Sequence, residues 1–309
     1  MVLAEVCEAT GWDHEMRVVE LPPDVHLAIN ALQMVVMKGI DLIIFTDLDG
    51  SLLDHETYSF EAAYPALQEV ERRGIPIVLC TSKTRAEVER FRRALNNHHP
   101  FIVENGGATF IPMGYFPFVS PYQREVGGYH VIEYGMPYPR LVDMLREVRA
   151  ESGARIAGFS DLSVEQVAAL TKLPAEGARL AKVREYDEPF FVKGPPEELD
   201  RVKTLFRKRG CRCTRGGRFH HLTGPNDKGK AVSDLVGLFE RAYGERRTVG
   251  IGDSQNDLPM LWAVDVPILV QQIDGKHDST VRVPNLIRAQ GIGPKGWRTA
   301  VLDLLVRQD

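Results

Sequence analysis

The feature that most constrains the fold is an alternation of buried-strand and helical patterns that begins near residue 40. Short, mostly apolar runs rich in β-branched residues occur at 41–46, 75–80 and 101–103. Such runs lack the polar–apolar alternation of a half-exposed strand, so they predict strands buried on both faces of a parallel sheet. Helical spacing follows the first two runs, at 60–73 and 84–95. Strands that alternate with helices in this way predict a doubly wound α/β sheet.

The middle of the chain has a different pattern, which predicts an inserted α+β domain. A stretch rich in Tyr, Phe, Pro and Gly at about 115–130 marks the boundary. Beyond it the spacing predicts helices at 141–150, 163–170 and 196–209 and a short strand at 189–193. The strand–helix alternation then returns with a helix at 230–242, a strand at 248–252 and a helix at 258–263.

A length of 309 residues is typical of about two domains. We therefore expect a core built from residues 40–122 and 222–309, interrupted by an inserted domain at 123–221. Residues 1–39 mix charged residues, two prolines and a moderately apolar segment. We predict that they form an N-terminal extension, to which the sequence assigns no role.

The charge balance excludes several classes of partner. The chain carries 38 basic and 42 acidic residues, a formal net charge of −4, whereas phosphate-binding surfaces for nucleic acid need a basic excess. No stretch reaches the roughly 18–20 apolar residues that span a bilayer, and no signal-peptide pattern is present. Four scattered cysteines suit a reducing compartment. We expect a cytoplasmic protein that binds neither nucleic acid nor membranes; its oligomeric state is left open.

The strongest chemical signal is the segment FTDLDGS, which places Asp47 and Asp49 at the carboxyl end of the first predicted strand. Ligands of open α/β sheets bind beyond the carboxyl ends of the strands, so both acids face the expected site. Two carboxylates so close together repel each other unless a cation or a shared proton relieves the charge. The segment therefore predicts a metal-assisted site rather than a structural turn.

A second acidic segment, GDSQND, follows the predicted strand at 248–252. Asp253 comes directly after that strand, so it lies at the same sheet edge and completes an oxygen-rich set of ligands suited to Mg²⁺. Asn256 and Asp257 follow in the same segment. Asp257 stands three residues after Ser254, which also fits a helix-capping arrangement, and capping is the structural alternative for this residue.

Two further loops carry groups suited to a phosphate. Thr81, Ser82 and Lys83 follow the second predicted strand, where hydroxyls and free backbone N–H groups before a helix form a phosphate cradle. Lys228 lies in GPNDKGKAV, just before the predicted helix at 230–242. This loop nearly matches a P-loop, but Ala231 replaces the hydroxyl that would bind magnesium.

Other common cofactor motifs do not match. No G-x-G-x-x-G is present, which argues against a dinucleotide site of the Rossmann type. Cys211 and Cys213, with His220 and His221, do not have the spacing of a structural zinc site. One of the two histidines remains a candidate to face the active-site cleft.

The segments DLDGS, TSKT, DKGKA and GDSQND, in this order between residues 47 and 257, resemble the four motifs of haloacid dehalogenase-like phosphatases. The long insertion between the second and third motifs resembles the type IIB cap of the Cof-like branch. Within that branch, TSKT, ENGGA, REYDEPF and GGRFHHL are similar to segments of the mannosyl-3-phosphoglycerate phosphatases. The narrower resemblance covers nearly everything after residue 40 and implies a haloacid dehalogenase-like core with an inserted cap.

The resemblance implies a role for each motif residue. Asp47 would be the nucleophile that forms an aspartyl-phosphate, and Asp49 the general acid and base. Mg²⁺ would be held by Asp47, the backbone carbonyl of Asp49, and Asp253. Thr81, or Ser82 in its place, would contact the phosphate. Lys228 would contact both the nucleophile and the phosphate. Asn256 and Asp257 would lie around the metal and Lys228.

The substrate implied by the narrower resemblance is mannosyl-3-phosphoglycerate, which carries a carboxylate beside the phosphate. Lys83 and Arg218 are candidates to bind that carboxylate, and Asn105 and His220 to bind sugar or glycerate hydroxyls. Closure of the cap would exclude water. The alternatives are phosphatases of glucosyl-3-phosphoglycerate or sucrose phosphate, a phosphomannomutase, and a catalytically silent module that binds a phosphorylated ligand; the intact motif carboxylates argue against the last. The choice among divalent metals is open.

Overall fold

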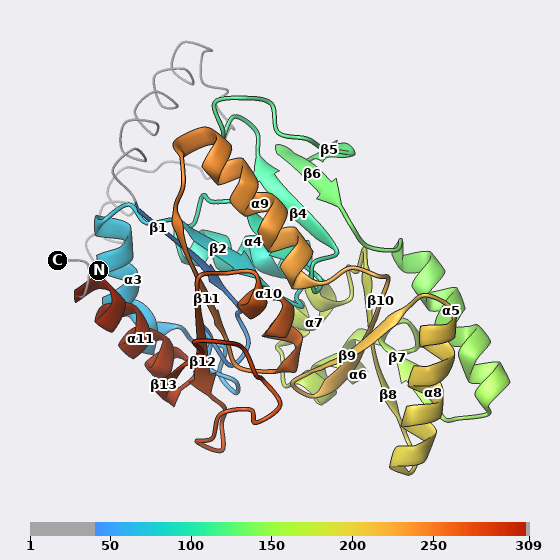
Figure 1. The fold of residues 1–309 in the computed structure, drawn as a ribbon. Coiled ribbons are helices and arrows are strands. Elements are labelled where there is room, and N and C mark those ends of the chain that lie inside the picture. The colour runs from blue at the N-terminus through green and yellow to red at the C-terminus, as the bar shows by residue number, and fades with distance from the viewer. Residues whose placement is uncertain (1–40, 307–309) are drawn as a thin grey trace, which may run out of the picture.

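The computed structural model describes residues 41–306, and the predicted N-terminal extension of 1–39 lies outside the described residues. Two bodies are visible, each built around its own sheet (Figure 1). No helix among the described residues is both long enough and apolar enough to cross a bilayer.

Within residues 41–306, the larger body contains one sheet of nine strands in the order β13-β12-β11-β1-β2-β3-β4-β6-β5. From β13 to β3 neighbouring strands are parallel, and β4, β6 and β5 add an antiparallel extension. The parallel strands are β1 (Leu42–Thr46), β2 (Ile77–Cys80), β3 (Phe101–Val103), β11 (Arg247–Gly252), β12 (Val266–Gln271) and β13 (Ile287–Ile292). Every residue of β1 is buried, as predicted for a strand buried on both faces of the sheet.

Helices cover this sheet on both faces (Figure 1). Helix α11 (Pro294–Val306) packs on α3 (Tyr64–Arg72), whereas α9 (Lys228–Tyr243) packs on α10 (Leu258–Trp262) and on β3 and β4 (Ala108–Pro112). The helix starts follow local chemistry: Thr84 caps α4 (Arg85–Ala94) in a reciprocal pair with Glu87, and Asp227 caps α9. The predicted doubly wound α/β core is thereby confirmed.

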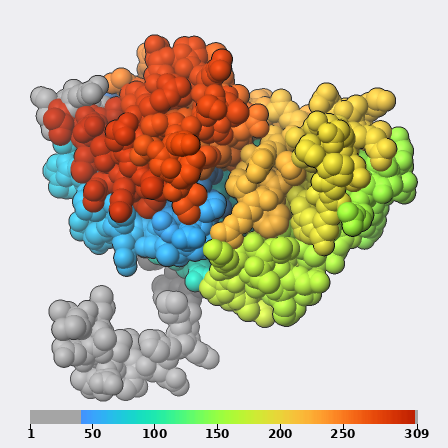
Figure 2. Space-filling model, turned by 90° about the horizontal axis from the view of Figure 1, so that it is seen from below, coloured from blue at the N-terminus to red at the C-terminus, as the bar shows by residue number. Residues whose placement is uncertain are grey.

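The smaller body has an antiparallel four-stranded sheet in the order β7-β8-β10-β9 within the described residues. Its strands are β7 (Ile156–Gly158), β8 (Asp187–Val192), β9 (Arg212–Gly216) and β10 (Phe219–Thr223). Its helices are α5 (Tyr138–Ser152), α6 (Val164–Thr171), α7 (Ala175–Ala181) and α8 (Pro196–Lys208). Buried residues of α5, α8, β8 and β10 form a hydrophobic core separate from that of the large sheet. This body is the cap, and in Figure 2 it forms a distinct green and yellow lobe.

Sheet membership places the start of the cap later than residue 123. Strands β5 (Arg124–Val126) and β6 (Tyr129–Glu133) form a hairpin that pairs with β4 and extends the large sheet. Tyr129 on this hairpin packs edge-on against the rings of Phe101 and Phe110, so part of the aromatic content that suggested a boundary packs on the core. By sheet membership, the cap follows Glu133 and ends with β10 at Thr223.

Candidate active site

The parallel pairing of β1 with β11 brings two acids together at one sheet edge. Asp47 follows β1 and Asp253 follows β11, and the backbone N–H of Asp47 donates to the carbonyl of Ile251 at 2.9 Å. Carboxylate oxygens of Asp47, Asp253 and Asp257 all lie within 4.8 Å of one another. Gly50, at φ +75°, lets the loop after β1 approach closely, because a Cβ there would lie 2.7 Å from Asp253 Oδ2.

Lys228 is the cation at the centre of this cluster. Its Nζ lies 2.7 Å from Asp47 Oδ1 and 2.6 Å from Asp257 Oδ1, and the side chain is fully buried. Burial favours the neutral amine, but the two carboxylates outweigh it and raise the pKa of Lys228 above its usual value. Asp257 also accepts hydrogen bonds from the N–H groups of Asp253 and Ser254, so both of its carboxylate oxygens have protein donors.

Asp47 and Asp253 lie in a buried cluster with more carboxylates than cations. Burial raises the pKa of Asp47 to about 7; Lys228 opposes this shift, and the charges of Asp257 and Asp49 add to it. Burial, together with Asp257 and Asp47, also raises the pKa of Asp253 well above its usual value. Three close carboxylates with one ammonium form an oxygen-rich, anionic set of donors, which fits a hard divalent cation such as Mg²⁺.

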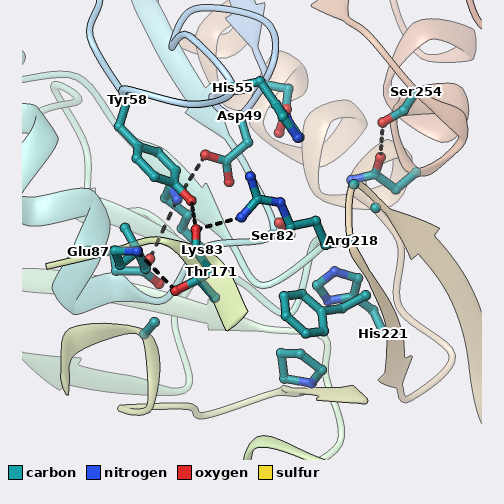
Figure 3. A pocket seen from close by; sticks show the side chains of 18 of the residues that line it. Asp49, His55, Tyr58, Ser82, Lys83, Glu87, Thr171, Arg218, His221 and Ser254 are labelled. Atoms are coloured by element: carbon teal, nitrogen blue, oxygen red, sulfur yellow. Dashed lines mark hydrogen bonds and ion pairs between the residues drawn. The ribbon is translucent and has the colours of Figure 1, made fainter. Parts of the chain in front are cut away.

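Asp49 lies next to this cluster and is about one-third exposed to the cavity. Lys83 Nζ lies 2.9 Å from Asp49 Oδ1, 3.5 Å from Glu87 Oε1 and 4.9 Å from the centre of the Tyr58 ring (Figure 3). Burial favours the neutral amine of Lys83, but Asp49 and Glu87 outweigh it and raise its pKa. Lys83 is therefore an ammonium group oriented by two acids and an aromatic face.

A cavity with an empty volume of about 800 Å³, open mouth included, separates this edge from the cap. Its walls on the core side include Asp47, Asp49, His55, Tyr58, Ser82, Lys83, Glu87, Asp253, Ser254 and Asn256. Its walls on the cap side include Phe159, Thr171, Leu173, Arg184, Gly216, Arg218, Phe219 and His221. Figure 3 shows His221 of the cap away from Lys83, and Arg218 extending from the cap toward the carbonyl of Thr171. The predicted acids of the core and residues of the cap thus line one cavity.

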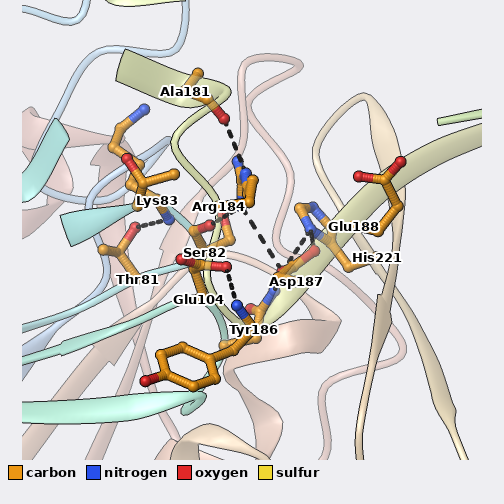
Figure 4. A network of polar contacts seen from close by, with 12 residues as sticks. Thr81, Ser82, Lys83, Glu104, Ala181, Arg184, Tyr186, Asp187, Glu188 and His221 are labelled. Atoms are coloured by element: carbon orange, nitrogen blue, oxygen red, sulfur yellow. Dashed lines mark hydrogen bonds and ion pairs between the residues drawn. The ribbon is translucent and has the colours of Figure 1, made fainter. Parts of the chain in front are cut away.

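Polar contacts join the core to the cap segment before β8 (Figure 4). Arg184 donates to the carbonyl of Ser82 at 2.8 Å, and the carboxylate of Glu104 accepts from the backbone N–H of Tyr186 at 2.7 Å. Asn105 Nδ2 donates to Asp187 Oδ2 at 2.7 Å. These contacts fix the position of the cap over the sheet edge.

Most of the predicted site residues lie at this cavity or directly behind it. Those that line it are Asp47, Asp49, Ser82, Lys83, Arg218, Asp253 and Asn256. Lys228 and Asp257 lie behind Asp47 in direct contact with one another. Thr81 is fully buried, and its Oγ1 accepts from the backbone N–H of Lys83 at 3.2 Å, so Ser82 is the hydroxyl that reaches the cavity wall.

The two residues predicted to bind substrate hydroxyls, His220 and Asn105, do not line the cavity. His220 lies on the opposite face of β10 from His221 and packs against the ring of Phe190, 5.7 Å between ring centres. Burial, with the charges of Lys203 and Arg215, lowers its pKa to about 4. The amide of Asn105 is occupied by protein partners rather than presented to the cavity.

The sequence did not nominate several residues that line the cavity, among them Tyr58, Glu87 and Arg184. Glu87 carried a signal, since it stands three residues after Thr84 as in a capping box. For the histidines the sequence offered two adjacent candidates, and only the register of β10 decides which one faces the cavity.

Comparison with known proteins agrees with this geometry. A family model described as haloacid dehalogenase-like hydrolase matches residues 44–114. A protein of Methanococcoides burtonii named glucosyl-3-phosphoglycerate/mannosyl-3-phosphoglycerate phosphatase is 48% identical over 263 residues, which is 85% of this chain and 97% of that relative. A mannosyl-3-phosphoglycerate phosphatase of Pyrococcus furiosus is 38% identical over 79% of this chain and 96% of its own.

The fold itself is similar to that of solved structures. The sugar phosphatase BT4131 of HAD subclass IIB aligns with a TM-score of 0.58 at 17% identity, over 86% of this chain and 98% of its own. The chain belongs to the haloacid dehalogenase-like hydrolase family. Within that family it is a phosphoric monoester hydrolase.

Proposed function

We propose that the chain is a Mg²⁺-dependent phosphatase that hydrolyses mannosyl-3-phosphoglycerate to mannosylglycerate and phosphate, in the synthesis of a compatible solute. The observation that carries the proposal is the contact of Lys228 with Asp47, in an acidic cluster at the carboxyl end of β1. The substrate is supported by the names of relatives that match most of the chain. The cavity between core and cap gives a substrate larger than a bare phosphate a place to bind.

The chemistry follows from the two acids after β1. Asp47 attacks phosphorus, the bond from phosphorus to the glycerate oxygen breaks, and Asp49 protonates the leaving alkoxide. Asp49 then takes a proton from a water that attacks the aspartyl-phosphate, which releases phosphate and restores Asp47. Lys228 orients Asp47 and offsets its charge, and Lys83 orients Asp49.

The metal would be held by Asp47, the backbone carbonyl of Asp49, and Asp253, with Asn256 and Asp257 around it. When bound, Mg²⁺ supplies positive charge that offsets the repulsion between the nucleophile and the phosphate. Asp257 serves mainly to hold Lys228, because both of its oxygens already accept hydrogen bonds from protein groups.

Glucosyl-3-phosphoglycerate is the second candidate substrate, since the relative from Methanococcoides burtonii is named for both sugars. Phosphate release should be measured with Mg²⁺ and with EDTA. The panel contains mannosyl- and glucosyl-3-phosphoglycerate, sucrose phosphate, mannose phosphates, 3-phosphoglycerate and p-nitrophenyl phosphate. We expect turnover that EDTA abolishes and Mg²⁺ restores, with mannosyl-3-phosphoglycerate giving the highest kcat/KM.

Each outcome of this panel has a separate meaning. A preference for the glucosyl compound would replace the sugar and keep the reaction, and turnover of sucrose phosphate or mannose phosphates alone would discard the glycerate. Interconversion of mannose phosphates would indicate a phosphomannomutase. Saturable binding without release of phosphate from any compound would indicate a binding module.

Arg218 provides a test of carboxylate recognition. It lines the cavity, and its Nη1 donates to the carbonyl of Thr171 at 2.8 Å. We propose that it binds the carboxylate of the glycerate, for which its planar fork is suited. Arg218→Ala is expected to lower kcat/KM for mannosyl-3-phosphoglycerate by about 10- to 100-fold and to change turnover of p-nitrophenyl phosphate by less than about threefold.

The matched control for this variant is Arg215→Ala. Arg215 lies on β9 of the same hairpin, is exposed and does not line the cavity. Its loss is expected to leave both substrates within about twofold. Equal losses of kcat/KM on both substrates in Arg218→Ala would mean that Arg218 stabilises the hairpin rather than binding the glycerate.

A further inference from the structure

A buried histidine–carboxylate pair lies on the cap sheet, and its histidine, His221, is part of the cavity wall. His221 on β10 and Asp187 on β8 are diagonal neighbours on one face of that sheet, since His221 pairs with Pro189. His221 Nδ1 lies 3.0 and 2.9 Å from the two carboxylate oxygens of Asp187 (Figure 4). Asp187 is fully buried and His221 is only 5% exposed, so water does not compete for this contact.

A residue of the core donates a hydrogen bond to the carboxylate of Asp187. Asn105 Nδ2 donates to Asp187 Oδ2 at 2.7 Å, and Asn105 Oδ1 in turn accepts from Asn256 Nδ2 at 3.2 Å. Asn256 itself lies in the loop of the acidic cluster and lines the same cavity. A chain of hydrogen bonds thus runs from the catalytic edge of the core to the imidazole of the cap.

These contacts determine which ring nitrogen is available. In this contact Nδ1–H donates to the carboxylate of Asp187, and a neutral ring with its proton on Nδ1 has Nε2 as an acceptor. The hydrogen bonds found for this ring within residues 41–306 are both made by Nδ1. A Cβ on Gly216 would lie 3.3 Å from Nε2, so glycine at that position leaves the space beside this acceptor open.

The acceptor character of His221 Nε2 determines which group of the substrate it can bind. Phosphate and carboxylate groups have no proton to donate to a neutral Nε2, whereas a hydroxyl does. The C2 oxygen of 3-phosphoglycerate is the position that a sugar can occupy, so the hydroxyl donors of a glycosylated 3-phosphoglycerate belong to the sugar. The rings of Phe159 and Phe219 line the same region and offer apolar surface to a sugar ring.

We propose that His221 determines specificity for the sugar by accepting a hydrogen bond from a sugar hydroxyl at Nε2, with Asp187 as its positioning residue. This inference rests on the proposed function. His220, which the sequence nominated for this role, lies on the opposite face of the same strand against Phe190. The two adjacent histidines therefore form a natural pair of test and control.

His221→Asn is the sharpest variant, because the amide nitrogen of Asn takes the place of Nδ1 and keeps a donor for Asp187 while Nε2 is lost. His220→Asn is the control. For mannosyl-3-phosphoglycerate we expect His221→Asn to raise KM by about 10- to 100-fold and to change kcat by less than about threefold. Turnover of p-nitrophenyl phosphate and competitive inhibition by 3-phosphoglycerate, neither of which carries a sugar, are expected to stay within about twofold. His220→Asn is expected to leave all three values within about twofold.

The outcomes separate this inference from the proposed function. Equal losses on the sugar-free ligands, or an unchanged KM for the sugar substrate, would overturn the role of His221. Similar losses from His220→Asn would overturn the assignment of faces. Wild-type protein that hydrolyses p-nitrophenyl phosphate but no glycosylated 3-phosphoglycerate would overturn the proposed function and this inference with it.

A measurement on the wild-type protein does not depend on how the variants fold. Long-range ¹H–¹⁵N spectra distinguish the two tautomers of a neutral imidazole, with His221→Asn used to assign the signals. We expect the proton on Nδ1 and a shift of the Nε2 resonance when mannosylglycerate is added. A proton on Nε2 in the neutral ring, or a Nε2 resonance insensitive to the sugar, would contradict the proposal.

Discussion

Asp47→Asn is expected to lower phosphate release by at least about a thousandfold on every substrate, because the amide cannot attack phosphorus. The fold should remain, since Asn has the same shape and Lys228 keeps its contact with Asp257 at 2.6 Å. The measurements are kcat with excess Mg²⁺, circular dichroism, and mass spectrometry of protein quenched in acid during turnover. The wild type should show a phosphorylated species that the variant lacks.

The matched control is Asp234→Asn, which removes a partly exposed carboxylate that pairs with Lys230 on the surface of α9. We expect its activity to stay within about twofold, because an exposed pair contributes little. Residual activity of Asp47→Asn above about one-tenth of the wild type, in a folded protein, would remove Asp47 from the role of nucleophile.

The stability of the Asp47→Asn variant should depend on pH in a characteristic way. The pKa of Asp47 in the folded, metal-free protein is about 7, above its ordinary value of 3.8. The stability that wild-type protein gains from the raised pKa of Asp47 is therefore fully present below pH 3.8 and is lost as the pH rises through about 7. In EDTA, the free energy of unfolding should fall less for the Asn variant than for the wild type between pH 5 and pH 8. Parallel curves would contradict the raised pKa.

Lys228→Met is expected to reduce both stability and activity. Removing the ammonium leaves the carboxylates of Asp47 and Asp257 buried without their shared cation, and uncompensated buried charges of this kind cost about 3–5 kcal/mol. Turnover should fall at least about a thousandfold, because the nucleophile loses its orientation and a cation near the phosphate. Unfolding in urea and phosphate release measure the two effects.

Lys230→Met is the control for this variant. Lys230 lies two residues along the same helix; it is exposed, and its partner Asp234 is about one-third exposed rather than buried. Its substitution should change stability by less than about 0.5 kcal/mol and leave turnover within about twofold. If the two variants behaved alike, the buried contacts of Lys228 would not contribute what the geometry implies.

Some features of the fold could be predicted from the sequence and others could not, for physical reasons. Asp47 and Asp253 were predictable because each follows a strand buried on both faces, and parallel neighbours must end at one edge. The hairpin of β5 and β6 was not predictable, because its aromatic and glycine-rich sequence is typical of a loop and only its pairing with β4 shows that it belongs to the sheet. Pairing between distant segments is a property of the whole sheet and leaves little local signal.

The sequence by itself determined the alternation of the core, the acids at its strand ends and the motif residues that resemble the family's, because those features depend on local spacing. Only the tertiary structure decided that His221 rather than His220 faces the cavity, since a one-residue change of register exchanges the two faces of a strand. It also decided that Asn105 holds Asp187 instead of facing the cavity, and that Lys83 pairs with Asp49. Such contacts join segments up to 82 residues apart, and only folding sets their distances.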